Sequence, residues 1–117
     1  MTGPWHTLEL IETRIGDPPV PVIHLTGMCS RWHDPEDRIG QALEALPTGG
    51  GLIIDVGALI YSDMYFLRLL FDARALHTLV LVGPLGPALR HRLRTTGTSD
   101  LFDVQATLHE ALARLGR

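Results

Sequence analysis

The chain holds few residues that could do chemistry, and the first group surrounds its only cysteine. Cys29 and His33 lie close together in segment 27–33, which also contains Ser30 and Trp32. A zinc site needs three or four ligands in a defined geometry, and the other histidines are scattered along the chain without the spacing of ligands. A cysteine–histidine nucleophile also needs an orienting group and an oxyanion site, and no residues can be assigned to either. We therefore expect no metal ion, no cofactor and no catalysis here.

A second group, residues 62–65, stands where a long apolar helix is predicted to begin. The first N–H groups of a helix lack partners within the helix, and Ser62 or Asp63 can cap them. Met64 and Tyr65 follow, and Arg68 comes one turn later. Two interpretations remain open. Either Met64 and Tyr65 contact a partner protein, or Met64 covers the edge of the core while Tyr65 lies on the protein's own surface.

A third group, residues 83–87, follows a predicted buried strand and precedes a helix, where nucleotide-binding folds hold phosphate. Its two prolines remove N–H donors, and neither the Walker pattern nor the full dinucleotide-binding pattern is present. A strand-to-helix turn is the simpler interpretation. Arg90, His91, Arg92 and Arg94 then form a basic strip, which is typical of a solvated helix face and leaves an acidic partner open.

The stretch from residue 52 to residue 76 organises the rest of the chain. Residues 52–56 are apolar at nearly every position, which is typical of a central strand covered on both faces. A connector over 57–63 and a helix over 64–76 are predicted to follow. The helix has a wide apolar stripe, formed by Phe66, Leu67, Leu69, Leu70, Phe71, Ala73 and Leu76. Tyr65, Arg68 and Asp72 fall together on its narrow polar side.

The segments before this stretch predict a strand pair and one helix. Residues 8–12 and 20–26 have strand patterns and are joined by the turn-rich link 16–19, which favours an antiparallel pair. Residues 27–33 are predicted as a loop. Asp34 and Pro35 then indicate a helix start, with Asp34 at the N-cap and Pro35 at the first helical position.

Strands and helices continue to alternate after residue 76. We predict a strand over 78–82, a helix that stops near Gly97, a short strand over 101–104 and a last helix opened by Thr107 and Glu110 as a capping box. This order indicates an α/β fold with a small mixed β-sheet and helices packed against it. We expect a single domain over residues 1–117, with its core at about 8–115.

Composition narrows the class of protein. The hydrophobic fraction of 45% and the charged fraction of 20% are ordinary for a soluble globular domain. No apolar run approaches the roughly 18 residues that span a bilayer, and residues 1–6 lack the pattern of a secretory signal. A single cysteine fits a reducing cytoplasm, and the net charge of −3 argues against a footprint for a phosphate backbone. We expect a cytoplasmic protein without direct nucleic-acid or membrane contact.

Residues 53–63, with the sequence Ile-Ile-Asp-Val-Gly-Ala-Leu-Ile-Tyr-Ser-Asp, and Leu67 resemble the signature of the STAS domain family, which includes the anti-sigma factor antagonists. In that family, a strand ending in aspartate leads through an apolar loop to Asp-Ser-Ser-Gly-Leu, or a close variant, at a helix start. Asp63 and Leu67 match, whereas Met64, Tyr65 and Phe66 replace the three residues between them. The resemblance covers roughly residues 8–115 and implies a STAS-like fold.

The resemblance also implies a function. Such a protein is a non-catalytic regulatory module that binds an anti-sigma factor, commonly a serine kinase of the histidine-kinase-like ATPase fold, and so frees a sigma factor. The first serine of the family motif is the phosphate acceptor in switching members, and Met64 stands in its place. No phosphorylation is expected at Met64, and Ser62 is a weaker candidate. The alternative is a small-ligand or nucleotide-binding regulatory domain, with a pocket between Gly83-Pro84 and the connector at Ser62-Asp63.

In relatives, the helix start and the loop after the second strand share the partner surface. Trp32 is either an exposed anchor on this surface or folded back on the domain. Carried onto this chain, the predicted partner-binding residues are Ser62, Asp63, Met64, Tyr65, Arg68, Cys29, Ser30 and Trp32.

Overall fold

A five-stranded mixed sheet forms the centre of the computed structural model, which describes residues 7–116. Its strands lie in chain order across the sheet: β1 (Leu8–Ile15), β2 (Val20–Cys29), β3 (Gly51–Ser62), β4 (Thr78–Val82) and β5 (Asp103–Gln105). β1 and β2 form the predicted antiparallel pair, and the other neighbours are parallel, so the mixed sheet is confirmed. Residues 1–6, which carried the expectation about a secretory signal, lie outside the described residues.

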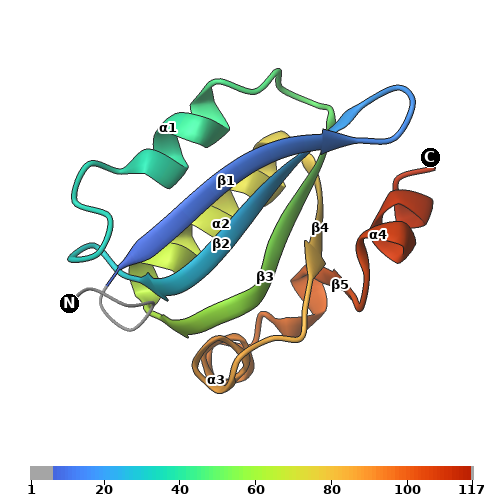
Figure 1. The fold of residues 1–117 in the computed structure, drawn as a ribbon. Helices are drawn as coiled ribbons and strands as arrows, with labels where there is room; N and C mark the ends of the chain where they lie inside the picture. Colours follow the sequence, from blue (N-terminus) through green and yellow to red (C-terminus); the bar gives the residue numbers. More distant parts are fainter. Residues whose placement is uncertain (1–6, 117) are drawn as a thin grey trace.

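The helices divide between the two faces of the sheet. α1 (Arg38–Glu44) and α2 (Met64–Leu76) cover one face, and α4 (Leu108–Arg114) covers part of the other (Figure 1). α3 (Pro87–Thr95) lies beside β3 and α2 and is followed by a 3₁₀ turn, η1 (Ser99–Leu101). Right-handed crossovers that advance in one direction across a sheet place their helices on the same face, which explains why α1 and α2 lie together. No helix within residues 7–116 is long and apolar enough to cross a membrane.

The two-sided sheet explains why β3 is apolar at nearly every position. Leu52 and Ile54 pack in the larger core cluster with α2, and Ile53 packs in the smaller cluster with Ala111 of α4. The predicted bounds of α2 are confirmed, and most of its apolar stripe is buried. Leu76 is an exception: it is 52% exposed because it lines an open groove between α1 and α2.

β2 and β3 are longer than predicted. The expected loop over 27–33 is wrong in its first part, because β2 continues to Cys29. The expected connector over 57–63 is wrong except at Asp63, because β3 continues to Ser62. The two extensions pair with each other through irregular register, with Met28 opposite Tyr61. Gly57 permits a close approach of backbones there, since a Cβ atom at this position would lie 2.9 Å from the Gly83 carbonyl oxygen.

The predicted start of the first helix is also wrong. α1 begins at Arg38, and its N-cap, Asp37, is in the left-handed region with a φ of 55°. Asp34 nevertheless caps the helix from a distance, because its carboxylate accepts hydrogen bonds from the N–H groups of Arg38 and Ile39 at 2.9 and 3.2 Å. The later helices and β4 follow the predictions, with Thr107 capping α4 by accepting from the N–H of Glu110. The strand predicted over 101–104 is shifted, because β5 begins at Asp103 after the 3₁₀ turn.

Candidate functional site

The ends of β2 and β3 bring the two predicted contact segments together. Cys29 lies opposite Ser62 in the sheet, and the N–H of Asp63 donates to the Cys29 carbonyl oxygen at 3.3 Å. The chain leaves β2 into the loop 30–37 and leaves β3 directly into α2, and so the loop lies beside the first turn of α2. This is the adjacency that the family resemblance implied.

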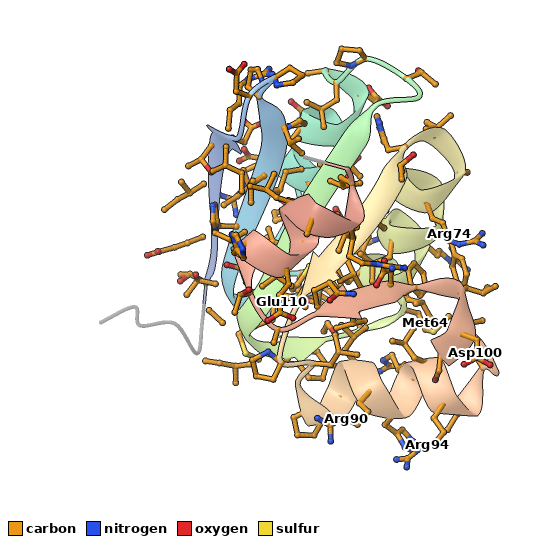
Figure 2. All side chains as sticks on the ribbon, turned by 90° about the vertical axis from the view of Figure 1, so that its right-hand side faces the viewer. Met64, Arg74, Arg90, Arg94, Asp100 and Glu110 are labelled. Atoms are coloured by element: carbon orange, nitrogen blue, oxygen red, sulfur yellow. The ribbon has the colours of Figure 1, made fainter. Side chains whose placement is uncertain are left out.

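The first turn of α2 presents a capped helix start with an exposed methionine. Asp63 is the N-cap, and its side chain accepts a hydrogen bond from the N–H of Tyr65 at 3.0 Å. Met64 is 42% exposed, whereas Ser62 is buried. In Figure 2, Met64 lies toward the end of the molecule where α3 carries Arg90 and Arg94, which point outward.

Tyr65 connects this helix start to the neighbouring loop. Its hydroxyl lies 3.0 Å from Oδ2 of Asp34 and 2.6 Å from Oδ1 of Asp37. Asp34 also binds α1 and the guanidinium of Arg38, which in turn donates to the Leu8 carbonyl oxygen of β1 at 2.9 Å. One tyrosine therefore ties the start of α2 to the loop, to α1 and, through Arg38, to the edge of the sheet.

Electrostatics support this hydrogen-bond network. Desolvation raises the pKa of Tyr65, and its hydrogen bonds to Asp37 and Asp34 raise it further. Desolvation also acts to raise the pKa of Asp34, but the donors at the N–H groups of Arg38 and Ile39 and the Tyr65 hydroxyl outweigh it and lower that pKa. Tyr65 thus remains a neutral donor, and Asp34 remains a charged acceptor.

A surface hollow lies between this network and the polar side of α2, and we call it the α2-start hollow. It has a volume of about 560 Å³ and is lined by Arg31, Trp32, Asp34, Pro35, Asp37, Tyr65, Arg68, Leu69 and Asp72. Trp32 is 90% exposed, which answers the question of whether it folds back on the domain. The guanidinium of Arg31 lies 5.7 Å from the centre of the Tyr65 ring, within the range of a cation–π interaction.

Three predicted contact residues lie inside the fold. Cys29, Ser30 and Ser62 are buried, so the expectation that their side chains face a partner is corrected. Ser30 instead shapes the loop, because its Oγ lies 2.6 Å from Nδ1 of His33 and accepts a hydrogen bond from the N–H of Trp32. Desolvation, with the charges of Asp34 and Asp63, raises the pKa of the Cys29 thiol, which therefore stays protonated at neutral pH.

The other groups singled out in the sequence do not form a site of comparable size. Between β3 and the start of α3, near the expected ligand pocket, the hollow measures only about 10 Å³, and small-molecule pockets are typically about 300–1,000 Å³. In the basic strip, Arg90 and Arg92 donate to backbone carbonyl oxygens of Leu85 and Ser62. Within residues 7–116, no group of three or more His, Cys, Asp or Glu side chains could hold a metal ion.

Sequence reasoning missed the role of Asp34 and Asp37 in this site. The sequence indicates Asp34 only as a helix start and gives no role to Asp37, although both accept a hydrogen bond from the Tyr65 hydroxyl, 31 and 28 residues away. It also missed a polar relay on the other face of the sheet, where His24 bridges Asp55 at 3.1 Å and Thr13 at 2.9 Å. No sequence spacing signals either set, because the sheet alone brings them together.

Two solved structures share this fold. An anti-sigma factor antagonist from Mycobacterium paratuberculosis aligns with a TM-score of 0.74 at 23% sequence identity, covering 96% of this chain and 97% of that chain. The Bacillus cell fate determinant SpoIIAA, in its phosphorylated form, aligns with a TM-score of 0.61 at 19% identity, covering 91% of this chain and 98% of that chain. No protein-family model and no curated protein sequence matches this chain. The STAS-like fold is therefore confirmed.

Proposed function

We propose that this chain is a non-catalytic regulatory module that binds an anti-sigma factor and thereby frees a sigma factor. The observation that carries the proposal is the surface at the start of α2, on a fold shared with an anti-sigma factor antagonist. Trp32 and Met64 are both exposed on neighbouring segments there. Large exposed apolar side chains beside a hollow are typical anchors of a protein interface.

Charge adds to the case for a protein partner at this surface. Arg31 and Arg68 line the α2-start hollow, and neither makes an ion pair with residues 7–116. Arginine and aromatic side chains are enriched at protein interfaces. We propose contacts through Asp63, Met64, Tyr65, Arg68 and Trp32, with the buried Cys29, Ser30 and Ser62 supporting them from below.

The same surface supports binding that is not switched by phosphate at the position of Met64. Methionine has no hydroxyl, and the nearby Ser62 is buried, which keeps it from a kinase in the folded state. A phosphate adds about −1.5 to −2 charges at a contact surface, whereas methionine resembles the uncharged, binding-competent state. The other hydroxyl near Met64, that of Tyr65, is already held by hydrogen bonds to the carboxylates of Asp34 and Asp37.

The partner that the proposal favours is an anti-sigma factor that is a serine kinase with a histidine-kinase-like ATPase fold. We propose that the two proteins bind in the cytoplasm and that this chain contacts neither nucleic acid nor a membrane directly. The alternative, a small-ligand or nucleotide-binding domain, receives less support, because the hollow beside α3 measures only about 10 Å³. Thermal stabilisation by a ligand panel would test that alternative, since a ligand at about 100 times its Kd adds roughly 2.7 kcal/mol.

The proposal is tested by affinity capture from native lysate, with bound proteins identified by mass spectrometry. Wild-type protein should recover a kinase-like anti-sigma factor, and Met64→Asp should lose it, because a negative charge then stands at the centre of the contact surface. An acidic residue in the first turn of a helix is electrostatically favourable, and so the variant should fold.

A matched control variant changes the net charge by the same amount as Met64→Asp, but at a position away from the proposed contact surface. His109→Asp adds one negative charge in the first turn of α4, on the opposite face of the sheet, and should leave recovery unchanged. If Met64→Asp still recovers the anti-sigma factor, the interface lies elsewhere on the molecule. If the wild-type protein recovers no kinase-like anti-sigma factor, the proposed role in a sigma-factor pathway is wrong, and only the assignment of the fold stands.

A further inference from the structure

A second depression lies along the seam between α1 and α2, and we call it the α1–α2 groove. It has a volume of about 400 Å³, and its apolar floor includes Leu43, Leu69 and Leu76. Leu76 is 52% exposed in this groove, although it belongs to the apolar stripe of α2. The groove meets the α2-start hollow only at residues 37, 69 and 72 and otherwise runs toward the far end of α2.

The rim of the α1–α2 groove is acidic. Asp37, Glu44 and Asp72 line it, whereas no arginine or lysine of the described chain does. None of the three carboxylates forms an ion pair within residues 7–116. Asp37 accepts from the Tyr65 hydroxyl, while Glu44 and Asp72 are exposed to solvent.

A groove with an apolar floor, and with acidic side chains on its rim that form no ion pairs, favours a partner of defined chemistry. The floor favours a large aliphatic or aromatic side chain, because burying it removes apolar surface from water on both partners. The rim favours lysine or arginine beside that side chain and repels an acidic segment. An amphipathic helix offers both, with apolar anchors at helical spacing and cations at the flanks.

We propose that the α1–α2 groove is a docking site for a basic amphipathic segment of a partner protein. An apolar side chain of the segment enters between Leu43, Leu69 and Leu76, and its cations face Glu44 and Asp72. This site adjoins the surface proposed for the anti-sigma factor and shares Asp37, Leu69 and Asp72 with the α2-start hollow. Its test does not use that protein, so the two proposals can fail independently.

The test is an NMR titration of the full ¹⁵N-labelled chain with a synthetic amphipathic helix of leucine and lysine. Saturable shifts should appear at the backbone amides of Leu43, Leu69 and Leu76. A leucine–glutamate helix of the same pattern should give none, and Leu76→Ser, a change at an exposed position, should weaken binding of the lysine peptide.

Two double variants separate the groove from general attraction to an acidic protein. Glu44→Gln with Asp72→Asn should raise the Kd of the lysine peptide about five- to tenfold, because two favourable charge contacts are lost. Glu9→Gln with Asp100→Asn removes the same net charge at exposed positions outside the groove and should change the Kd less than about twofold.

Three outcomes overturn the proposal. The first is shifts that map away from the α1–α2 groove or are missing altogether. The second is equal weakening in both double variants, which would leave only non-specific charge attraction. The third is binding of the glutamate peptide with the affinity of the lysine peptide.

Discussion

Tyr65 has two roles in this molecule, and the two concern different atoms. Its half-buried ring lines the α2-start hollow, under the guanidinium of Arg31. Its hydroxyl is held by Asp34 and Asp37 and so fixes the loop against α2. The two interpretations left open from the sequence, contact residue or part of the protein's own surface, therefore need not exclude each other for this side chain.

Removing the Tyr65 hydroxyl should separate these roles. We expect Tyr65→Phe to lower the free energy of unfolding by about 1–3 kcal/mol, because two carboxylates lose a donor while the ring remains. Urea unfolding measures the change. Tyr61→Phe is the matched control, since the Tyr61 side chain is 38% exposed and its hydroxyl makes no hydrogen bond with residues 7–116. Equal losses in the two variants would show that the network with Asp34 and Asp37 contributes nothing.

At the scale of elements, α1 depends on a residue outside itself. The helix is short, and the side chain of its own N-cap, Asp37, accepts no hydrogen bond from the N–H groups of the first turn. Asp34 provides the missing acceptor for two N–H groups and adds an ion pair to Arg38 at 3.2 Å. Short helices are marginal on their own, and so this buried carboxylate is central to keeping α1 in place.

This dependence predicts a loss of stability in acid. The pKa of Asp34 is lowered by folding, so the unfolded chain binds a proton more readily than the folded protein does. The stability that Asp34 contributes is therefore present above its ordinary pKa of about 4, and it is lost as the pH falls through the lower folded pKa. Asp34→Asn should be less stable than wild type at pH 7, and the difference should shrink steadily as the pH falls below about 4.

Unfolding curves from neutral to acidic pH check this prediction. Glu36→Gln is the control, because Glu36 is exposed and its side chain makes no hydrogen bond within the described chain. That variant should follow the wild-type curve closely. A constant gap between Asp34→Asn and wild type across the whole pH range would contradict a role for the charge.

At the scale of the whole molecule, stability and partner binding lie in different parts of α2. Phe66, Leu67 and Leu70 are fully buried against the sheet, while Met64 and Arg68 face outward. The single helix thus holds the larger core cluster together and presents a surface at its start. The other face of the sheet has a smaller cluster under α4, so the molecule relies mainly on α2 for its core.

Two truncations should show this division. Phe66→Ala should destabilise the domain by about 3–5 kcal/mol, through lost burial and the cavity it leaves. Trp32→Ala should change stability by no more than about 0.5 kcal/mol, because that side chain is 90% exposed. Thermal and urea unfolding give both values. A large loss for Trp32→Ala would mean that this tryptophan supports the fold rather than a partner surface.

Elements whose signals are local could be predicted from the sequence. α2 has its predicted bounds because Asp63 caps it and its apolar side chains repeat at helical spacing. β3 was recognisable as a central strand because both of its faces are apolar, and α4 because Thr107 caps its first turn. The resemblance to the STAS family added the overall fold, which the solved structures confirm.

The extent of the strands and the shape of the site depend on contacts between segments that are distant in sequence. β2 and β3 continue past their predicted ends because they pair with each other, Met28 with Tyr61 and Cys29 with Ser62, and a strand pairing across 33 residues leaves no local pattern. The partners of Tyr65 are fixed in the same way, since Asp34 comes beside it only when the ends of β2 and β3 meet. Caps and helical periodicity act between neighbours in sequence, whereas strand pairing and the hollow at the start of α2 arise from contacts that exist only in the assembled sheet.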